Sequence, residues 1–227
     1  MDTAFAEVNG ARLRYSLQGE GQPMVMIHSV LARLEMWDEQ VSAFSNRFRV
    51  IRYDTRGYGW STGPEGNYTD YEDLAALLDN LRVDRAVLMG SSSGGGIAID
   101  FALAFPARVR ALVLAGSALS GTAPDPDPAI DPTRAAIAAA YERGDIAQAA
   151  ELTAQIWVDG PRRTPQSVSH AYRSRALEMI CFTLGLPDRA DPRQLEPPAA
   201  GRLGEIQAPA LVVLGGEDTA WMHRVSG

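Results

Sequence analysis

Short apolar segments alternate with stretches of helical spacing along most of the chain. The apolar or alternating segments that predict buried strands are 24–28, 48–53, 85–90, 109–116 and 210–216. Between them, apolar residues three and four positions apart predict helices at 36–45, 70–81 and 93–105. Strands that alternate with helices form parallel sheets that are covered on both faces. The pattern therefore predicts an α/β fold with a mostly parallel sheet.

Local signals mark the ends of several predicted elements. Asn9 and Gly10 form a strong turn dipeptide, which predicts a hairpin near the N-terminus. Thr69 and Glu72 have the spacing of a capping box, which starts a helix. Pro106 ends the small-residue helix of the middle segment, because proline cannot continue a helix.

A helical insertion interrupts the alternating pattern. Segment 120–132 is rich in Pro and Asp, as linkers are. Residues 133–183 predict two or three helices, one of which we expect to begin at Thr164-Pro165, an N-cap followed by proline. The expected domains are a core in two parts, 1–119 and 206–227, and a helical cap insertion at 120–205.

Composition and charge exclude several kinds of chemistry. The 227 residues carry 21 basic and 28 acidic side chains, and the net charge of −7 argues against nucleic acid and membrane surfaces as partners. Every basic residue is arginine, which excludes Schiff-base, pyridoxal-phosphate and P-loop lysine chemistry. The single cysteine, Cys181, excludes an internal disulfide and a cysteine zinc site. The histidines His28, His170 and His223 lack metal-ligand spacing.

Targeting signals are also missing from the sequence pattern. The N-terminal segment is acidic and lacks the basic and apolar regions of a signal peptide. No apolar stretch approaches the length of a membrane span. We therefore expect a cytoplasmic protein.

The pattern Gly-x-Ser-x-Gly occurs twice, around Ser61 and around Ser92. Ser61 lies in a polar loop that Pro64 follows, so we interpret it as a turn serine. Ser92 directly follows an apolar strand and precedes a small-residue helix, which is the setting of a nucleophile elbow. Gly90 and Gly94 leave room for the sharp turn. A structural glycine-rich turn and a phosphate-binding loop are the alternatives, although the loop's lysine and G-x-G-x-x-G spacing are missing.

Several blocks, in order, resemble the α/β-hydrolase superfamily as far as Asp218. The blocks are MVMIHSVLARLEMWDEQ, FRVIRYDTRGYGWST, DLAALLDNLRVDRAVLMGSSSGGGIAIDFALAFP and APALVVLGGED. Within the superfamily, IHS…MWD and RYDTRGYG are similar to the 3-oxoadipate enol-lactonase branch and its esterase neighbours. The helical insertion lies where that superfamily has its cap. The resemblance implies a hydrolase of a small carboxylic ester or lactone that needs no metal and no organic cofactor.

The resemblance also implies a role for each matching residue. Ser92 would be the nucleophile, and the backbone N–H groups of Val30 and Ser93 would form the oxyanion hole. Asp218 follows the strand ALVVL, where the family has the acid that orients a catalytic histidine. A serine hydroxyl is a weak nucleophile and needs such a base, whose tautomer the acid fixes. An acyl-enzyme would form, and water would then release it.

The catalytic histidine is the departure from the family pattern. The family places it a few tens of residues beyond the acid, whereas this chain ends nine residues after Asp218. We therefore expect a chain truncated before its last strand and helix. His223 is the candidate base by position, with a role as a surface residue as the alternative. We expect His28 to support the oxyanion loop and His170 to lie on a helix surface.

A non-catalytic α/β-hydrolase-like protein that binds a ligand or a partner is the main alternative function, and the missing histidine favours it. A cofactor-free haloperoxidase or dehalogenase relative would share the scaffold, but it ranks low, because a dehalogenase carries Asp where this chain has Ser92. Without a last strand, the apolar segment 210–216 becomes an open sheet edge, so we expect self-association through it.

The remaining candidates lie in the two blocks before the elbow. Ser29 and Trp37 are the candidate substrate-binding residues, although a core position is the favoured interpretation of Trp37. Asp54 and Arg56 of RYDTRG are expected to form a local hydrogen-bonded turn.

Overall fold

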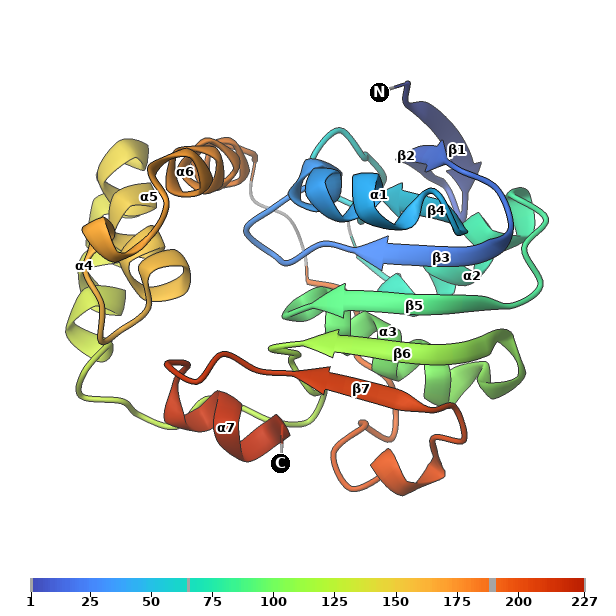
Figure 1. Cartoon of the computed structure of the whole chain (residues 1–227). Coiled ribbons are helices and arrows are strands. Elements are labelled where there is room, and N and C mark those ends of the chain that lie inside the picture. The colour runs from blue at the N-terminus through green and yellow to red at the C-terminus, as the bar shows by residue number, and fades with distance from the viewer. Residues whose placement is uncertain (1, 65, 188–190, 227) are drawn as a thin grey trace. The chain divides into compact units, whose positions relative to one another are not determined.

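The computed structural model describes residues 2–64, 66–187 and 191–226, and its central feature is a seven-stranded sheet. The strand order is β1-β2-β4-β3-β5-β6-β7 (Figure 1). β2 pairs with β1 and with β4 in the antiparallel sense, and all other neighbours are parallel. The strands are β1 (Ala4–Val8), β2 (Ala11–Gln18), β3 (Gln22–Ile27), β4 (Phe48–Tyr53), β5 (Ala86–Ser91), β6 (Val109–Ala115) and β7 (Ala210–Val213). The predicted mostly parallel sheet is thus confirmed.

Three helices connect the parallel strands of the sheet. They are α1 (Asp38–Phe44), α2 (Asp70–Asn80) and α3 (Ser93–Ala104). α1 lies on one face of the sheet, and α2 and α3 lie on the other (Figure 1). Parallel neighbours need such crossover helices, because a tight turn cannot join them.

The local signals in the sequence mark real element ends. Asn9 (φ 48°) and Gly10 (φ 74°) form the left-handed turn between β1 and β2. The hydroxyl of Thr69 accepts a hydrogen bond from the Glu72 N–H at 3.3 Å and donates to the Glu72 carboxylate at 2.6 Å. This capping box satisfies an N–H group that the first turn of α2 would leave free.

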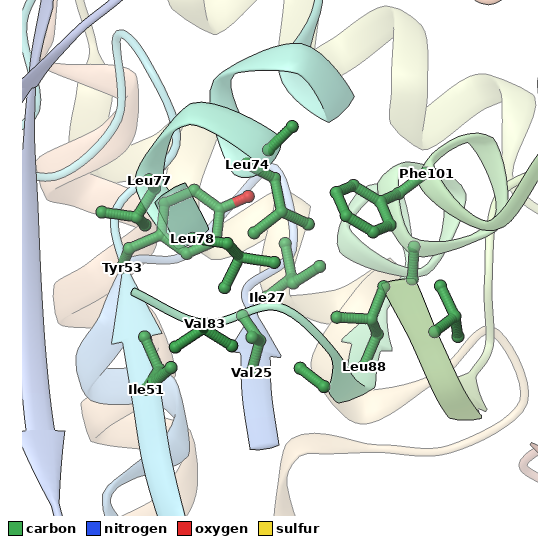
Figure 2. Packing of buried hydrophobic residues seen from close by; sticks show 14 of the residues in the cluster. Val25, Ile27, Ile51, Tyr53, Leu74, Leu77, Leu78, Val83, Leu88 and Phe101 are labelled. Atoms are coloured by element: carbon green, nitrogen blue, oxygen red, sulfur yellow. The ribbon is translucent and has the colours of Figure 1, made fainter. Parts of the chain in front are cut away.

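The larger hydrophobic core lies between the sheet and helices α2 and α3. Figure 2 shows Leu74 and Leu78 of α2 and Phe101 of α3 packed near Val25 and Ile27 of β3, and all five side chains are buried. Burial of large apolar side chains is the main force that holds helices to a sheet. This core therefore fixes α2 and α3 against the strands.

A smaller core lies on the opposite face of the sheet. Met24 and Met26 alternate with the β3 residues of the larger core, as a strand requires, and pack with Val41 of α1. Trp37, in the turn before α1, belongs to the same cluster.

The structure divides into two compact units. The described residues of 1–122 and 188–213 form the unit that contains the sheet, and those of 123–187 and 214–225 form the second unit. The helices in 123–187 are α4 (Asp131–Glu142), α5 (Ile146–Ala154) and α6 (His170–Leu184). The expectation of two or three helices there is correct. Residues 191–205, which we expected in the insertion, belong with the sheet.

The helix expected at Thr164-Pro165 begins later, which corrects the prediction. Pro165–Ser167 form only a three-residue turn, and Val168 returns to extended backbone (φ −114°, ψ 143°). The Thr164 side chain caps no N–H group, and α6 begins at His170 after Ser169.

The chain after β7 contains one more helix. α7 (Ala220–Ser226) follows a short turn, in a segment for which the sequence predicted no element. The Thr219 hydroxyl accepts a hydrogen bond from the Met222 N–H at 3.3 Å. This side chain therefore stabilises the start of α7, a local signal that the sequence prediction overlooked.

Strand β7 is an apolar edge of the sheet. Its residues Leu211, Val212 and Val213 are 58%, 46% and 47% exposed, so neither face of the strand is covered. Unpaired N–H and C=O groups on such an edge can pair with another strand.

Candidate active site

Ser92 lies in the sharp turn between β5 and α3. β5 ends at Ser91 and α3 begins at Ser93, so Ser92 alone connects them. Its φ of 51° and ψ of −119° lie in a region that L-residues rarely adopt. Strained backbone of this kind persists only where the surrounding structure enforces it, and it is concentrated at functional sites. The strand–turn–helix context that we predicted is thus present.

Close backbone contacts on each side of Ser92 explain its flanking glycines. A Cβ on Gly90 would lie 2.2 Å from the Gly94 carbonyl oxygen. A Cβ on Gly94 would lie 2.3 Å from the Ile27 carbonyl oxygen and 2.5 Å from that of His28. No real Cβ makes contacts this short, so both positions require glycine. The start of α3 therefore lies directly against the end of β3.

Hydrogen bonds fix the backbone of Ser92 on both sides. Its N–H donates to the Ala115 carbonyl at 3.0 Å. Its carbonyl accepts from the N–H groups of Gly95, Gly96 and Ala118 at 3.0, 3.1 and 2.9 Å. In the part of the chain that the structure describes, the Ser92 hydroxyl makes no hydrogen bond. The backbone is thus held while the hydroxyl stays available.

The loop after β3 lies next to the elbow, because β3 and β5 are parallel neighbours that pair Ile27 with Gly90. His28 begins this loop and is 1% exposed. Its Nε2 accepts a hydrogen bond from the Thr55 N–H at 3.0 Å, so its Nδ1 carries the proton and donates to the Ser29 carbonyl at 2.7 Å. His28 therefore supports the loop, as expected. Val30, two residues further, is 40% exposed.

Asp54 and Arg56 have separate partners, which corrects the expected local turn. The Asp54 carboxylate accepts hydrogen bonds from the Leu34 N–H at 2.7 Å and the Trp60 N–H at 3.0 Å. Arg56 forms a two-pronged ion pair with Asp73 of α2, with both bonds at 2.8 Å. Asp54 therefore connects the turn after β4 to the segment of Leu34, and Arg56 connects the same turn to α2.

Ser61, the centre of the other Gly-x-Ser-x-Gly pattern, is 4% exposed. Its hydroxyl accepts a hydrogen bond from the Arg14 N–H at 2.8 Å and donates to the Asp54 carbonyl at 2.7 Å. Its interpretation as a turn serine agrees with this geometry.

Asp218 and His223 lie in the second unit, on the turn before α7 and on α7 itself. The Asp218 carboxylate accepts a hydrogen bond from the Thr219 N–H at 2.7 Å. His223 is exposed, and no hydrogen bond joins it to Asp218 within the described residues. The structure thus gives Asp218 a turn-forming contact and gives His223 a surface position.

The other candidate residues have clear places. Trp37 is 6% exposed and lies in the smaller core, the position that the sequence favoured for it. Ser29 is half-buried in the loop after β3. His170 is exposed at the start of α6, as expected. Cys181 is a partly buried free thiol.

Glu35 and Asp100, two carboxyl groups of the first unit, have pKa values shifted in opposite directions. Burial alone would raise the pKa of Glu35, but the hydrogen bond and charge of Arg14 lower it below the usual 4.5. Burial raises the pKa of Asp100 on α3 above 3.8, although the Ser120 hydroxyl and the Leu195 N–H partly oppose this. The two groups therefore respond to pH in opposite directions.

A hollow of about 650 Å³ lies beside α2 and contains none of the candidate catalytic residues. Its arginines are already paired, since Arg56 binds Asp73 and Arg108 binds Asp79 at 2.7 Å. Among residues 2–64, 66–187 and 191–226, no group of three His, Cys, Asp or Glu could hold a metal ion. The same residues include no helix of sufficient length and apolarity to cross a membrane.

A family model of the alpha/beta hydrolase fold matches residues 22–180. This span exceeds half of the chain, and it includes the elbow and most of the sheet. The chain therefore belongs to the α/β-hydrolase fold family, as the resemblance predicted.

Several relatives of the chain carry hydrolase or lactonase names. A 3-oxoadipate enol-lactonase 2 of Acinetobacter baylyi is 35% identical over 104 residues, which are 44% of this chain and 39% of the relative. A 2-hydroxy-6-oxononadienedioate/2-hydroxy-6-oxononatrienedioate hydrolase of Burkholderia vietnamiensis is 31% identical over 222 residues, which are 91% of this chain and 75% of the relative. The chain spans 39% and 38% of the first two curated relatives. The class that these relatives define is that of hydrolytic enzymes.

Solved structures give the same family. A hydrolase of Pseudomonas aeruginosa has a TM-score of 0.69 and 29% identity, over 98% of this chain and 84% of the other. The enol-lactonase of Burkholderia xenovorans has a TM-score of 0.60 and 27% identity, over 98% and 86%. The fold of the described residues is thus similar to that of two hydrolytic enzymes.

Proposed function

We propose that this chain is a serine hydrolase of small carboxylic esters or lactones, with Ser92 as its nucleophile. The observation that carries the proposal is the strained backbone of Ser92 at the turn between β5 and α3, with its hydroxyl free of hydrogen bonds in the described residues. A nucleophile in this position is exposed at the end of the sheet. The enol-lactonase names of two similar proteins favour an enol-lactone among the possible substrates.

The reaction would proceed through an acyl-enzyme. The Ser92 oxygen bonds to the carbonyl carbon as its proton passes to a base. The carbonyl oxygen becomes an oxyanion, which the N–H groups of Val30 and Ser93 stabilise. The bond from carbon to the leaving oxygen then breaks, and that oxygen takes the proton. Water then bonds to the acyl carbon and gives a proton to the base. The bond from that carbon to the Ser92 oxygen breaks, the oxygen takes the proton back, and the carboxylic acid leaves.

The proton of the Ser92 hydroxyl needs a base to accept it. We assign Asp218 as the acid that orients a histidine, and His223 as the histidine that the sequence offers. Aligned donors in an oxyanion hole contribute about 10²–10³ in kcat, so weak turnover is expected even with a poorly placed base.

Labelling with a fluorophosphonate, beside turnover of p-nitrophenyl acetate, tests the nucleophile. We expect mass spectrometry to find the adduct on Ser92, and Ser92→Ala to lose both label and turnover. Ser61→Ala is the matched control, because it changes the other serine of the same pattern and should keep the label. A folded wild-type chain with neither label nor turnover would refute the proposal, as would label on Ser92→Ala.

A non-catalytic binding protein is the second candidate. The hydrogen bond from the Thr219 N–H to the Asp218 carboxylate favours it, since a catalytic acid should bind a histidine. A folded, inactive chain that still binds an enol-lactone or its acid product by calorimetry would support this function.

We also propose that copies of the chain associate through β7. Residues 206–216 carry no charge, so two copies of this segment can pair without repulsion despite the net charge of −7. Leu211→Arg should therefore lower the apparent mass in size-exclusion chromatography. Leu203→Arg, at an exposed leucine outside the strand, is the control. A wild-type monomer at high concentration would contradict this proposal.

The expected cytoplasmic location, and the expected lack of nucleic-acid and membrane partners, stay predictions.

A further inference from the structure

The loop that carries Val30 is attached to its surroundings at both ends. At the first end, His28 accepts a hydrogen bond from the Thr55 N–H. At the other end, the Leu34 N–H donates to the Asp54 carboxylate at 2.7 Å, and the Leu34 carbonyl accepts from Arg52 at 3.0 Å. The segment between these ends is short, so its attachments determine where the Val30 N–H points.

Asp54 binds the second end of this loop. Its side chain is fully buried and accepts three hydrogen bonds, from the Leu34 N–H, from the Trp60 N–H and from Arg14 at 3.3 Å. These donors come from three different segments of the chain. A buried carboxylate is stable only when its oxygens are hydrogen-bonded in this way. Asp54 therefore holds the end of the Val30 loop against β2 and against the turn after β4.

Charged neighbours reinforce the same contact. Arg14 also binds Glu35 at 2.5 Å, and Glu35 accepts a hydrogen bond from Arg33 at 3.1 Å. Both Glu35 and Arg33 are chain neighbours of Leu34. The network around Asp54 thus holds three consecutive residues of the loop.

The elbow is sensitive to the position of this loop. Gly94, at the start of α3, packs against the carbonyl groups of Ile27 and His28 so closely that no Cβ would fit between them. The start of the loop and the elbow are therefore in direct contact. An oxyanion donor works only when it lies within hydrogen-bond distance of the developing charge.

We propose that Asp54 is a positioning residue that keeps the Val30 N–H aligned for the oxyanion formed at Ser92. The proposal rests on the function proposed above. Asp54 touches no substrate. It acts through Leu34 and the loop before it.

Asp54→Asn is the main test, because it keeps the shape and one acceptor oxygen of the side chain. Asp54→Ala removes every acceptor and is the second variant. Asp73→Asn is the matched control: Asp73 is equally buried and ion-paired, but its bonds go to Arg56 and Asn9 and none reaches the Val30 loop.

Two measurements distinguish positioning from general stability. Amide hydrogen exchange should become at least about tenfold faster at residues 29–34 in Asp54→Asn, and should stay unchanged there in Asp73→Asn. Turnover of p-nitrophenyl acetate, normalised to the labelled fraction of Ser92, should show kcat lower by about 10–100-fold with little change in KM. A loss of this kind indicates an interaction made only in the transition state.

Each other outcome has a distinct meaning. Unchanged exchange at 29–34 in both Asp54 variants overturns the positioning proposal, whatever the activity. Faster exchange with normal kcat also overturns it, because the loop would then have no role in the reaction. A wild-type chain without label or turnover refutes the proposed function itself, and with it the catalytic purpose of Asp54. In that case hydrogen exchange at 29–34 still shows whether Asp54 holds the loop, so the two proposals can fail separately.

Discussion

Ser61 and Ser92 both stand at the centre of a Gly-x-Ser-x-Gly pattern, and the fold gives them opposite surroundings. The hydroxyl of Ser61 is buried and uses both its acceptor and its donor on backbone groups of Arg14 and Asp54. The backbone of Ser92 is strained and fixed, whereas its hydroxyl has no hydrogen bond in the described residues. The fold is thus stabilised by the hydroxyl of Ser61, but only by the backbone groups of Ser92.

The comparison shows that the Gly-x-Ser-x-Gly pattern marks places where the chain packs closely against other atoms. The pattern alone does not identify a nucleophile. Glycines appear on both sides of each serine, because the chain approaches other atoms closely there. Around Ser92 those atoms are backbone of α3 and β3. Around Ser61 they are the Asp54 carboxylate, near Gly59, and the Ala11 side chain, near Gly63. Only the first arrangement places the serine at the end of the parallel sheet.

The second glycine of each pattern should show the largest difference. A Cβ at position 94 meets two backbone carbonyls that cannot move, so Gly94→Ala should cost more than about 3 kcal/mol of unfolding free energy. A Cβ at position 63 would lie 2.9 Å from the Ala11 Cβ and 3.2 Å from the Ala11 Cα, a less severe overlap, so Gly63→Ala should cost about 1–3 kcal/mol. Urea unfolding of both variants measures the difference. Equal costs would contradict the structure at the elbow.

Removal of each hydroxyl should have an intermediate effect on stability. Ser61→Ala leaves a buried N–H and a buried C=O without their partner, which costs about 1–3 kcal/mol. Ser92→Ala removes no hydrogen bond of the described structure, so its cost should stay within about 0.5 kcal/mol. Thermal and urea unfolding can compare the two variants directly. A large loss for Ser92→Ala would show that its hydroxyl has a structural partner.

The smallest effect should appear in the pH dependence of stability around the two serines. Glu35, which shares Arg14 with the Ser61 site, has a pKa lowered in the fold. Its contribution is therefore present above pH 4.5 and is lost as the pH falls through the folded value. Asp100, on the helix after Ser92, has a raised pKa, so its ionisation weakens the fold as the pH rises through the folded value.

The variants Glu35→Gln and Asp100→Asn should change the acid limb of the stability curve in opposite senses. Glu35→Gln should flatten the loss of stability below pH 4.5, because the unfolded chain no longer gains more protons than the fold at that site. Asp100→Asn should make the loss of stability at low pH steeper. In the wild type the folded chain binds a proton at Asp100 before the unfolded chain does, and this stabilising difference disappears in the variant. Unfolding midpoints between about pH 3 and pH 6 would reveal each slope. The same change in both variants would contradict the opposite pKa shifts.

Much of the fold could be predicted from local patterns. The strand and helix segments of the sheet, the turn at Asn9-Gly10 and the capping box of Thr69 all depend on residues that are neighbours in the chain. The setting of Ser92 between a strand and a helix also depends only on adjacent segments. Such signals act over a few residues, so the sequence displays them directly.

Other features could not be predicted, because their partners are remote in the sequence. Arg56 pairs with Asp73, 17 residues away, and Asp54 binds Arg14, 40 residues away. The sequence suggested instead that Asp54 and Arg56 form one local turn. The start of α6 was also misplaced, since Thr164 and Pro165 formed a cap pattern whose hydrogen bond the structure does not make.

The sequence by itself determined the family of the fold, the alternating elements and the strained place of Ser92, because chain neighbours and apolar spacing specify them. Only the tertiary structure decided that the Ser61 hydroxyl hydrogen-bonds to backbone groups, and that the Asp54 carboxylate binds the end of the Val30 loop. Those choices depend on which buried donors and acceptors meet across the sheet. A buried polar group must find a partner wherever the packing of the whole chain supplies one.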